Sequence, residues 1–223
     1  MTVEIEPLKS IPYFADLNSE ELGAIMLHVF EKSVDRGEII LLDEEPPKAI
    51  YFVISGAVKA FKTSAEGKEQ ILCIIRPGES FNDVPIFDGG PNPASVQAMG
   101  PATLYGIRRN DLETILREHP QVSLNANKVL AGRVRHLVSL VEDLSFRHVI
   151  GRVAKILLDY ASDGTGPRPR LTQQEMAAVA GTAREVVGRS LKALEGEGAI
   201  RLDRNRIIIA DRKILKEMVE ASS

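Results

Sequence analysis

The stretch TAREVVGRSLKALEGEG, residues 182–198, carries side chains that could read the edges of nucleic-acid bases. The charged side chains concerned are Arg184, Glu185 and Arg189. An arginine can donate to O6 and N7 of guanine together, and a glutamate can accept a hydrogen bond from N4 of cytosine. Because an α-helix fits the major groove of B-form DNA, these residues could act together if the stretch is helical.

The other residues of the stretch have the pattern of such a helix. Its apolar residues, spaced by four and three, are Val187, Leu191 and Leu194. This spacing places them on one face, which should be buried. Gly188 lies on the charged face, where the lack of a side chain would allow close approach to a groove. Glu185 also follows Thr182 by three residues, so a capping box is the alternative role for its carboxylate.

The segments on either side of this helix predict a compact motif. LTQQEMAAVA should be a helix that begins with a capping box between Thr172 and Glu175. Gly181 should end that helix. AIRLDRNRIIIA reads as a β-hairpin, and a final helix follows it. Helix, glycine turn, helix and hairpin in this order predict a winged helix-turn-helix.

Charge is distributed unevenly along the chain. Residues 1–146 contain 14 Lys and Arg against 21 Asp and Glu, a net charge of −7, whereas residues 147–223 contain 14 against 10, a net charge of +4. A basic C-terminal part suits a polyanionic partner. The chain has no tryptophan and few aromatic residues, which argues against a stacking platform for single strands.

The first half of the chain predicts a short helix followed by β-strands. A helix is expected over residues 18–30, with Val29 on its apolar face. From about residue 31, short β runs alternate with turn sequences that contain glycine. DGGPNP, residues 88–93, should be a loop because its two glycines and two prolines exclude regular structure. Short strands at regular spacing predict a sandwich or a barrel.

A long helix is expected after Pro120. A seam with alternating spacings of three and four runs along it, formed by Asn127, Leu130, Val134, Leu137, Val141 and Leu144. Asn and Val at a positions with Leu at d positions favour a parallel two-stranded coiled coil, in which a buried Asn fixes the register. The seam therefore predicts a homodimer, and packing of the helix on its own domain is the alternative. A second helix should cover residues 149–160.

Catalytic and metal-binding motifs are not recognisable. The four histidines are scattered, at His28, His119, His136 and His148. HExxH, GxSxG and Walker sequences are missing, and DGTGPRPR lacks the Lys-Ser/Thr ending that would cradle phosphates. Cys73 is the single cysteine, which excludes an intrachain disulfide, a cysteine-based zinc site and a four-thiolate iron–sulfur cluster. We expect a protein that is not an enzyme and has no metal site.

The sequence also indicates where in the cell the protein is expected. It has no run of about 18 apolar residues, which a membrane-spanning helix needs. MTVEIEPLKS at the start lacks the basic and apolar regions of a signal peptide. These features predict a cytoplasmic protein with no membrane partner.

Together these segments resemble the CRP/FNR family of bacterial transcription regulators. The resemblance is carried by RE-VV-GR, by GKEQIL and PGESFNDVPIFDGG, by a long helix ending in LSF, and by GRVAKILLDYA. It covers nearly the whole chain. It implies an α+β protein with a double-stranded, jelly-roll-like β-roll sensor domain (residues 1–120), a dimerisation helix (121–146) and a winged helix-turn-helix DNA-binding domain (147–223).

The resemblance also implies residue roles. Arg184, Glu185 and Arg189 would read bases in a TGTGA-like half-site of an inverted repeat of double-stranded DNA. Backbone phosphates would be contacted by Thr172, Gln174, Arg201, Arg204 and Arg206, which gives affinity without reading sequence. RNA polymerase is implied as a further partner. A β-roll module that controls a partner protein without binding DNA is the alternative.

The residues expected to bind an effector differ between this chain and its nucleotide-binding relatives. Those relatives carry Gly-Glu for the ribose hydroxyl and, ten residues after that Glu, Arg-Ser for the cyclic phosphate. The matching positions of this chain are Asn82-Asp83 and Pro93-Ala94, and Leu137 and Val138 stand where relatives place polar contacts to the purine. The expected effector pocket therefore consists of Asp83, Pro93, Ala94, Leu137 and Val138. Asp83 could still accept from a hydroxyl, but Pro93 offers a phosphate neither a cation nor an N–H. We therefore do not expect cyclic AMP. The alternatives are an apolar ligand, no effector, or haem, which would make the protein a gas-sensing regulator like some relatives that respond to nitric oxide.

Overall fold

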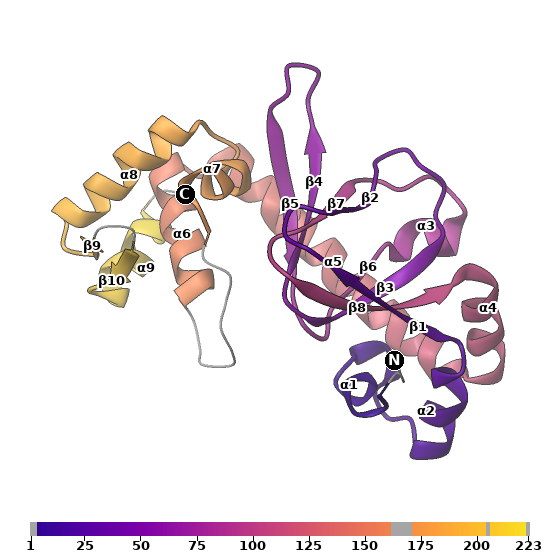
Figure 1. Cartoon of the computed structure of the whole chain (residues 1–223). Coiled ribbons are helices and arrows are strands. Elements are labelled where there is room, and N and C mark those ends of the chain that lie inside the picture. The colour runs from indigo at the N-terminus through magenta and orange to yellow at the C-terminus, as the bar shows by residue number, and fades with distance from the viewer. Residues whose placement is uncertain (1–3, 162–170, 204–205, 222–223) are drawn as a thin grey trace. The chain divides into compact units, whose positions relative to one another are not determined.

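The computed structural model describes residues 4–161, 171–203 and 206–221 (Figure 1). The chain divides into two compact units. The first comprises Met1–Lys62 and Leu72–His136, and the second comprises Thr63–Ile71 and Leu137–Ser223. The long helix α5 (Pro120–Phe146) therefore contributes its first part to one unit and its last turns to the other.

The first unit begins with three short helical elements, α1 (Glu6–Lys9), a 3₁₀ turn η1 (Pro12–Phe14) and α2 (Ser19–Met26). Asn18 caps α2 and forms a capping box with Glu21. The prediction that this helix extends to residue 30 is wrong. Val29 begins strand β1 and pairs with Ile107, and the ring of Phe30 covers Gly106. Strand pairing thus overrides the helical spacing of Val29.

Two four-stranded sheets form the body of this unit, with strand orders β1-β8-β3-β6 and β2-β7-β4-β5. The strands are β1 (Val29–Val34), β2 (Ile39–Leu41), β3 (Ala49–Ser55), β4 (Val58–Thr63), β5 (Glu69–Ile75), β6 (Ser80–Phe81), β7 (Ser95–Ala98) and β8 (Ala102–Arg108). A short helix, α3 (Asp83–Asp88), includes Asp88, the first residue of the loop expected over residues 88–93, and α4 (Arg109–Glu118) follows β8. The predicted antiparallel β-roll is confirmed.

Strand β3 serves two hydrophobic cores. Its side chains at Ile50 and Phe52 join a cluster with α1, α2, α4 and the start of α5, whereas Tyr51 and Val53 join a cluster between the two sheets. Alternation along the strand accounts for the division, because successive side chains of a strand point to opposite faces. Helix α5 is attached to the first of these cores through Val122.

The second unit contains the C-terminal motif. Its elements are α6 (Val149–Ala161), α7 (Gln173–Ala180), α8 (Arg184–Gly196), β9 (Ile200–Asp203), β10 (Arg206–Ile209) and α9 (Arg212–Glu220). Thr172 and Glu175 form the predicted capping box, and Gly181 ends α7 in the left-handed conformation. The hairpin pairs Arg206 with Asp203. The predicted winged helix-turn-helix is confirmed.

Candidate nucleic-acid interface and sensor pocket

Helix α8 buries one face and exposes the charged side chains of the other. Val187, Leu191 and Leu194 are buried in the core of the second unit, as their spacing predicts. Arg184, Glu185 and Arg189 are exposed. Within the described residues, none of these three charged side chains forms an ion pair or a hydrogen bond with the rest of the chain.

The alternative role of Glu185 as a capping residue is wrong. The N-cap of α8 is Ala183, not Thr182, and no side chain caps this end. Glu185 is therefore the second residue of the helix. Its carboxylate interacts favourably with the positive end of the helix dipole but takes no part in a capping box. The start of α7 differs, because Thr172 bonds the Glu175 amide there.

Gly188 is not required by the packing of the chain itself. A Cβ built at this position would meet no atom within 4 Å, and the residue has no positive φ. Glycine in a helix interior lowers stability relative to alanine. Gly188 therefore lowers the stability of α8, and no packing contact in the described chain requires a glycine at this position.

The residues expected to contact phosphates lie at the surface where they are described. Thr172, Gln174, Arg201 and Arg206 are all exposed. Because the Thr172 hydroxyl oxygen accepts from the Glu175 amide, its O–H remains able to donate. Arg204 lies outside the described residues.

In the first unit, Asp83 lies at the centre of a buried polar cluster. Its Oδ2 accepts from the Tyr13 hydroxyl at 2.6 Å and from the Ser80 hydroxyl at 3.0 Å. Arg133 of α5 approaches Oδ1 to 2.9 Å as an ion pair that lacks hydrogen-bond geometry. A second nitrogen of that guanidinium donates to Ser80. The fully buried Asp83 Oδ1 is thus an acceptor that no hydrogen bond satisfies.

Sequence reasoning found Asp83 but missed Tyr13 and Arg133. The three residues are far apart in the sequence, and no local spacing links them. Burial and, next, the charge of Asp83 raise the pKa of Tyr13 above its ordinary value, so its hydroxyl stays protonated and donates.

The remaining expected pocket residues differ in their surroundings. Ala94 is buried and Pro93 is exposed at the end of the loop after α3. Leu137 and Val138 belong to the second unit and are 48% and 63% exposed. The five expected pocket positions are thus divided between the two units.

The seam of α5 is largely exposed. Val134 and Val141 are 61% and 63% exposed, and Asn127 is exposed as well. Leu130 is partly buried. The buried asparagine of this helix is Asn125, which donates to the carbonyls of η1 and the residue after it.

The described part of the chain was compared with the requirements of a metal site and of a membrane-spanning helix. No group of three or more potential ligands is brought together there. Burial raises the pKa of the Cys73 thiol to about 11, which disfavours the thiolate that binds metals. None of the described helices combines the length and apolar character needed to cross a membrane.

A sensor-like β-roll, a long helix and a winged helix-turn-helix together define a class of DNA-binding regulators. Residues 31–119 match the cyclic nucleotide-binding domain, and residues 151–218 match the Crp-like helix-turn-helix domain. The chain belongs to the CRP/FNR family of transcription regulators, which are not enzymes.

Two relatives and one solved structure illustrate this membership. The chain is 33% identical to the "Cyclic AMP receptor protein" of Thermus thermophilus over 95% of this chain and 98% of that protein. It is 31% identical to the "CRP-like cAMP-activated global transcriptional regulator" of Mycobacterium tuberculosis, over 91% and 93% of the two chains. The structure is similar to the crystal structure of the Thermus thermophilus Catabolite Activator Protein, with a TM-score of 0.56 and 32% sequence identity. The match covers 95% of this chain and 100% of that chain.

Proposed function

We propose that this protein binds an inverted repeat of double-stranded DNA as a homodimer, with Arg184, Glu185 and Arg189 reading bases in the major groove. The observation that carries the proposal is the exposed face of α8. Opposite charges four residues apart on a helix normally gain by pairing, yet Glu185 and Arg189 do not pair. Their donors and acceptor remain available for base edges.

Exposed apolar residues on α5 support the dimer. Val134, Leu137 and Val141 lie at coiled-coil spacing and are each about half exposed or more. A line of apolar side chains left in water is unfavourable, and a second copy of the same helix would cover it. Residues 121–146 would then be the dimerisation helix between a sensor domain (1–120) and a DNA-binding domain (147–223).

Contacts to phosphates would fix the position of α8 on the duplex. Thr172, Gln174, Arg201 and Arg206 are exposed near or within the motif. The start of α8 adds backbone N–H groups that no side chain caps, and such groups suit a phosphate. These contacts would contribute affinity that falls with salt, without base preference.

The effector, if there is one, is not cyclic AMP bound in the manner of the family. Two relatives are named for cyclic AMP, but Pro93 and Ala94 stand where such relatives carry Arg-Ser. The Arg133 guanidinium does not replace that arginine, because it is already engaged by Asp83 and Ser80. A ligand hydroxyl could reach Asp83 Oδ1 only if Arg133 moved, because this oxygen is buried and lies 2.9 Å from that guanidinium.

DNA binding is tested by fluorescence anisotropy at moderate salt with an inverted repeat of TGTGA and a scrambled duplex. The parent protein should prefer the repeat. Arg189→Ala should weaken binding to the repeat by about 1–3 kcal/mol and relax the preference at one base pair. The control Arg135→Ala, at an exposed position on α5, should change neither the affinity for the repeat nor the base preference. An equal loss on both duplexes would make Arg189 a phosphate contact.

Calorimetry tests the effector. Cyclic AMP should show no binding at micromolar concentration, because a phosphate without its cation loses about 3–5 kcal/mol. The double variant Pro93→Arg/Ala94→Ser should gain affinity for it. Micromolar binding to the parent protein that also raises its affinity for DNA would contradict the proposal.

A further inference from the structure

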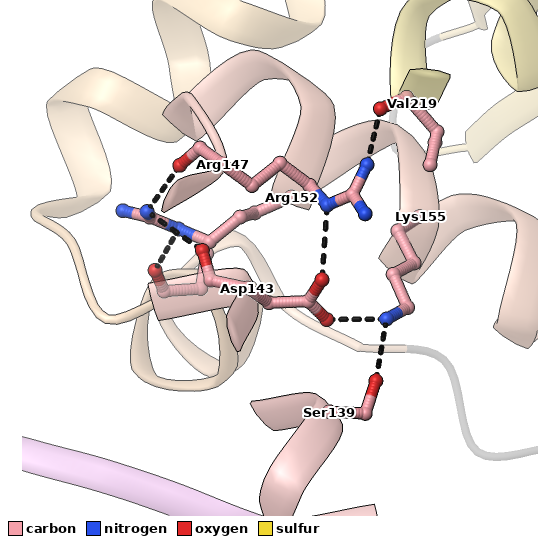
Figure 2. Close-up of polar contacts among 7 residues, drawn as sticks. Ser139, Asp143, Arg147, Arg152, Lys155 and Val219 are labelled. Carbon is pink, nitrogen blue, oxygen red and sulfur yellow. Dashed lines mark hydrogen bonds and ion pairs between the residues drawn. The ribbon is translucent and has the colours of Figure 1, made fainter. Parts of the chain in front are cut away.

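A cluster of ion pairs lies at the junction of α5 and α6, within the second unit (Figure 2). We call it the Asp143 cluster, and it consists of Asp143, Arg147, Arg152 and Lys155. Arg147 Nε donates to Asp143 Oδ1 at 2.9 Å, and Lys155 Nζ donates to Oδ2. The side chains of Asp143 and Arg147 are each 14% exposed, so water and salt screen this pair weakly.

The two guanidinium groups of the cluster bind the carboxyl ends of three helices. Arg152 Nη1 donates to the Arg147 carbonyl at 2.6 Å, just after the end of α5, and Arg152 Nε donates to the Ala180 carbonyl at the end of α7 at 2.8 Å. Arg147 Nη1 donates to the carbonyl of Val219 in the last turn of α9. The last carbonyls of a helix lack partners within it.

These helix ends explain why three cations gather around one carboxylate. Asp143 balances one positive charge. The negative ends of three helix dipoles stabilise the other two cations. Burial lowers the pKa of Arg152, whereas the charge of Asp143 raises it. The positive charges of the cluster are therefore all compensated only while the carboxyl ends of α5, α7 and α9 meet there.

The turn between α7 and α8 is held at the same junction. A Cβ at Gly181 would lie 2.8 Å from Cδ2 of Leu144, so the last turn of α5 packs directly on this turn. Ala180, whose carbonyl Arg152 binds, immediately precedes it. Because α8 begins only three residues after Gly181, its direction follows from how this turn is held.

We propose that Asp143 and Arg152 are positioning residues that fix the orientation of α8 relative to the end of α5. This inference rests on the proposed function, in which two copies of α5 pair and each copy of α8 enters a major groove. The orientation of α8 on α5 then determines which distance between half-sites a dimer accepts, a distance that is about one helical turn of DNA in this class.

The first test measures the orientation directly, without DNA. Spin labels are attached through Ser145→Cys on α5 and Ala193→Cys on α8, both exposed, in a Cys73→Ala background. Dilution with unlabelled protein restricts the measured distances to one chain. Asp143→Asn and Arg152→Lys should broaden or shift the distance distribution, since a single ammonium cannot bridge two helix ends. The matched controls Glu142→Gln and Arg135→Lys should leave it unchanged.

The second test uses operators whose half-sites are moved apart or together in steps of one base pair. The two cluster variants should lose about tenfold in affinity at the optimal spacing and accept neighbouring spacings more evenly, as expected for loss of a charged hydrogen bond. Binding to a single half-site and the slope of affinity against salt should stay at parental values, because neither residue touches DNA.

The outcomes separate this inference from the proposed function. An unchanged distance distribution in folded Asp143→Asn and Arg152→Lys would overturn the inference, and so would a reduced salt slope, which would make Arg152 a phosphate contact. Equal losses on half-sites and full operators would also overturn it, since they indicate general destabilisation. Absence of operator binding by the parent protein would refute the proposed function alone, because the distance measurement needs no DNA.

Discussion

At position 188, folding stability and the proposed binding to DNA favour different residues. It lies inside α8, where glycine costs conformational entropy, and its neighbourhood has room for a Cβ. The folded chain alone would therefore favour alanine. A groove of DNA approached closely by this face would favour glycine.

Gly188→Ala should accordingly raise the free energy of unfolding by about 0.5–1 kcal/mol and weaken binding to the operator. Thermal melting and anisotropy measure the two effects. Gly132→Ala is the matched control, because it also lies in a helix, at an exposed position of α5 with no atom near its Cβ. It should stabilise without changing DNA affinity. Unchanged DNA binding by Gly188→Ala would remove close approach as the reason for this glycine.

At the same scale, the sequence predicts outward-facing residues better than buried polar ones. The exposure of Arg184 and Arg189 follows from the positions of three apolar residues on the same helix. The partners of Asp83 could not be found in this way, because Tyr13 and Arg133 reach it from other elements. Tertiary packing alone brings these residues together.

At the scale of elements, the two helices of the helix-turn-helix begin differently. Thr172 caps α7 with its hydroxyl, whereas Ala183 starts α8 with an extended conformation, φ −88° and ψ 151°, and no side-chain oxygen. This backbone conformation is the one that N-cap residues adopt. A serine would therefore fit without rearrangement.

Ala183→Ser should raise the free energy of unfolding by about 1 kcal/mol, because its hydroxyl can accept from an unpaired amide of the first turn. Chemical denaturation of the parent and the variant measures the change. Thr172→Ala should lower stability by a similar amount, since it removes the capping bond that α7 already has. A neutral result for Ala183→Ser would mean that another group satisfies these amides.

Capping chemistry also explains which boundaries the sequence predicts well. The starts of α2 and α7 follow from Asn18 and Thr172, each with a glutamate three residues later. The helical spacing of Val29 predicts a longer α2 than the structure has, because Val29 pairs with β8 instead. Local signals fix a helix start, whereas the choice between helix and strand at Val29 depends on a partner far along the chain.

At the scale of the whole molecule, the proposed homodimer would depend on α5. Its seam residue Leu137 is half exposed in the single chain. Leu137→Glu should give a monomer at micromolar concentration in sedimentation and abolish preference for an inverted repeat, because two glutamates would face each other in the coiled coil. Arg135→Glu is the control at an exposed position outside the seam, and it should remain a dimer. A dimer with Leu137→Glu would place the subunit contact elsewhere.

The double role of β3 bears on how this family can diversify. Each side chain from Ala49 to Val53 packs into one core or the other, and a change of volume in a packed core is disfavoured. Evolution therefore has little freedom in this strand. New specificities for small molecules must arise at positions released from both cores, such as the exposed Pro93 after α3. A substitution in the short loop after α3 can therefore change the surface of the first unit while both of its cores stay packed.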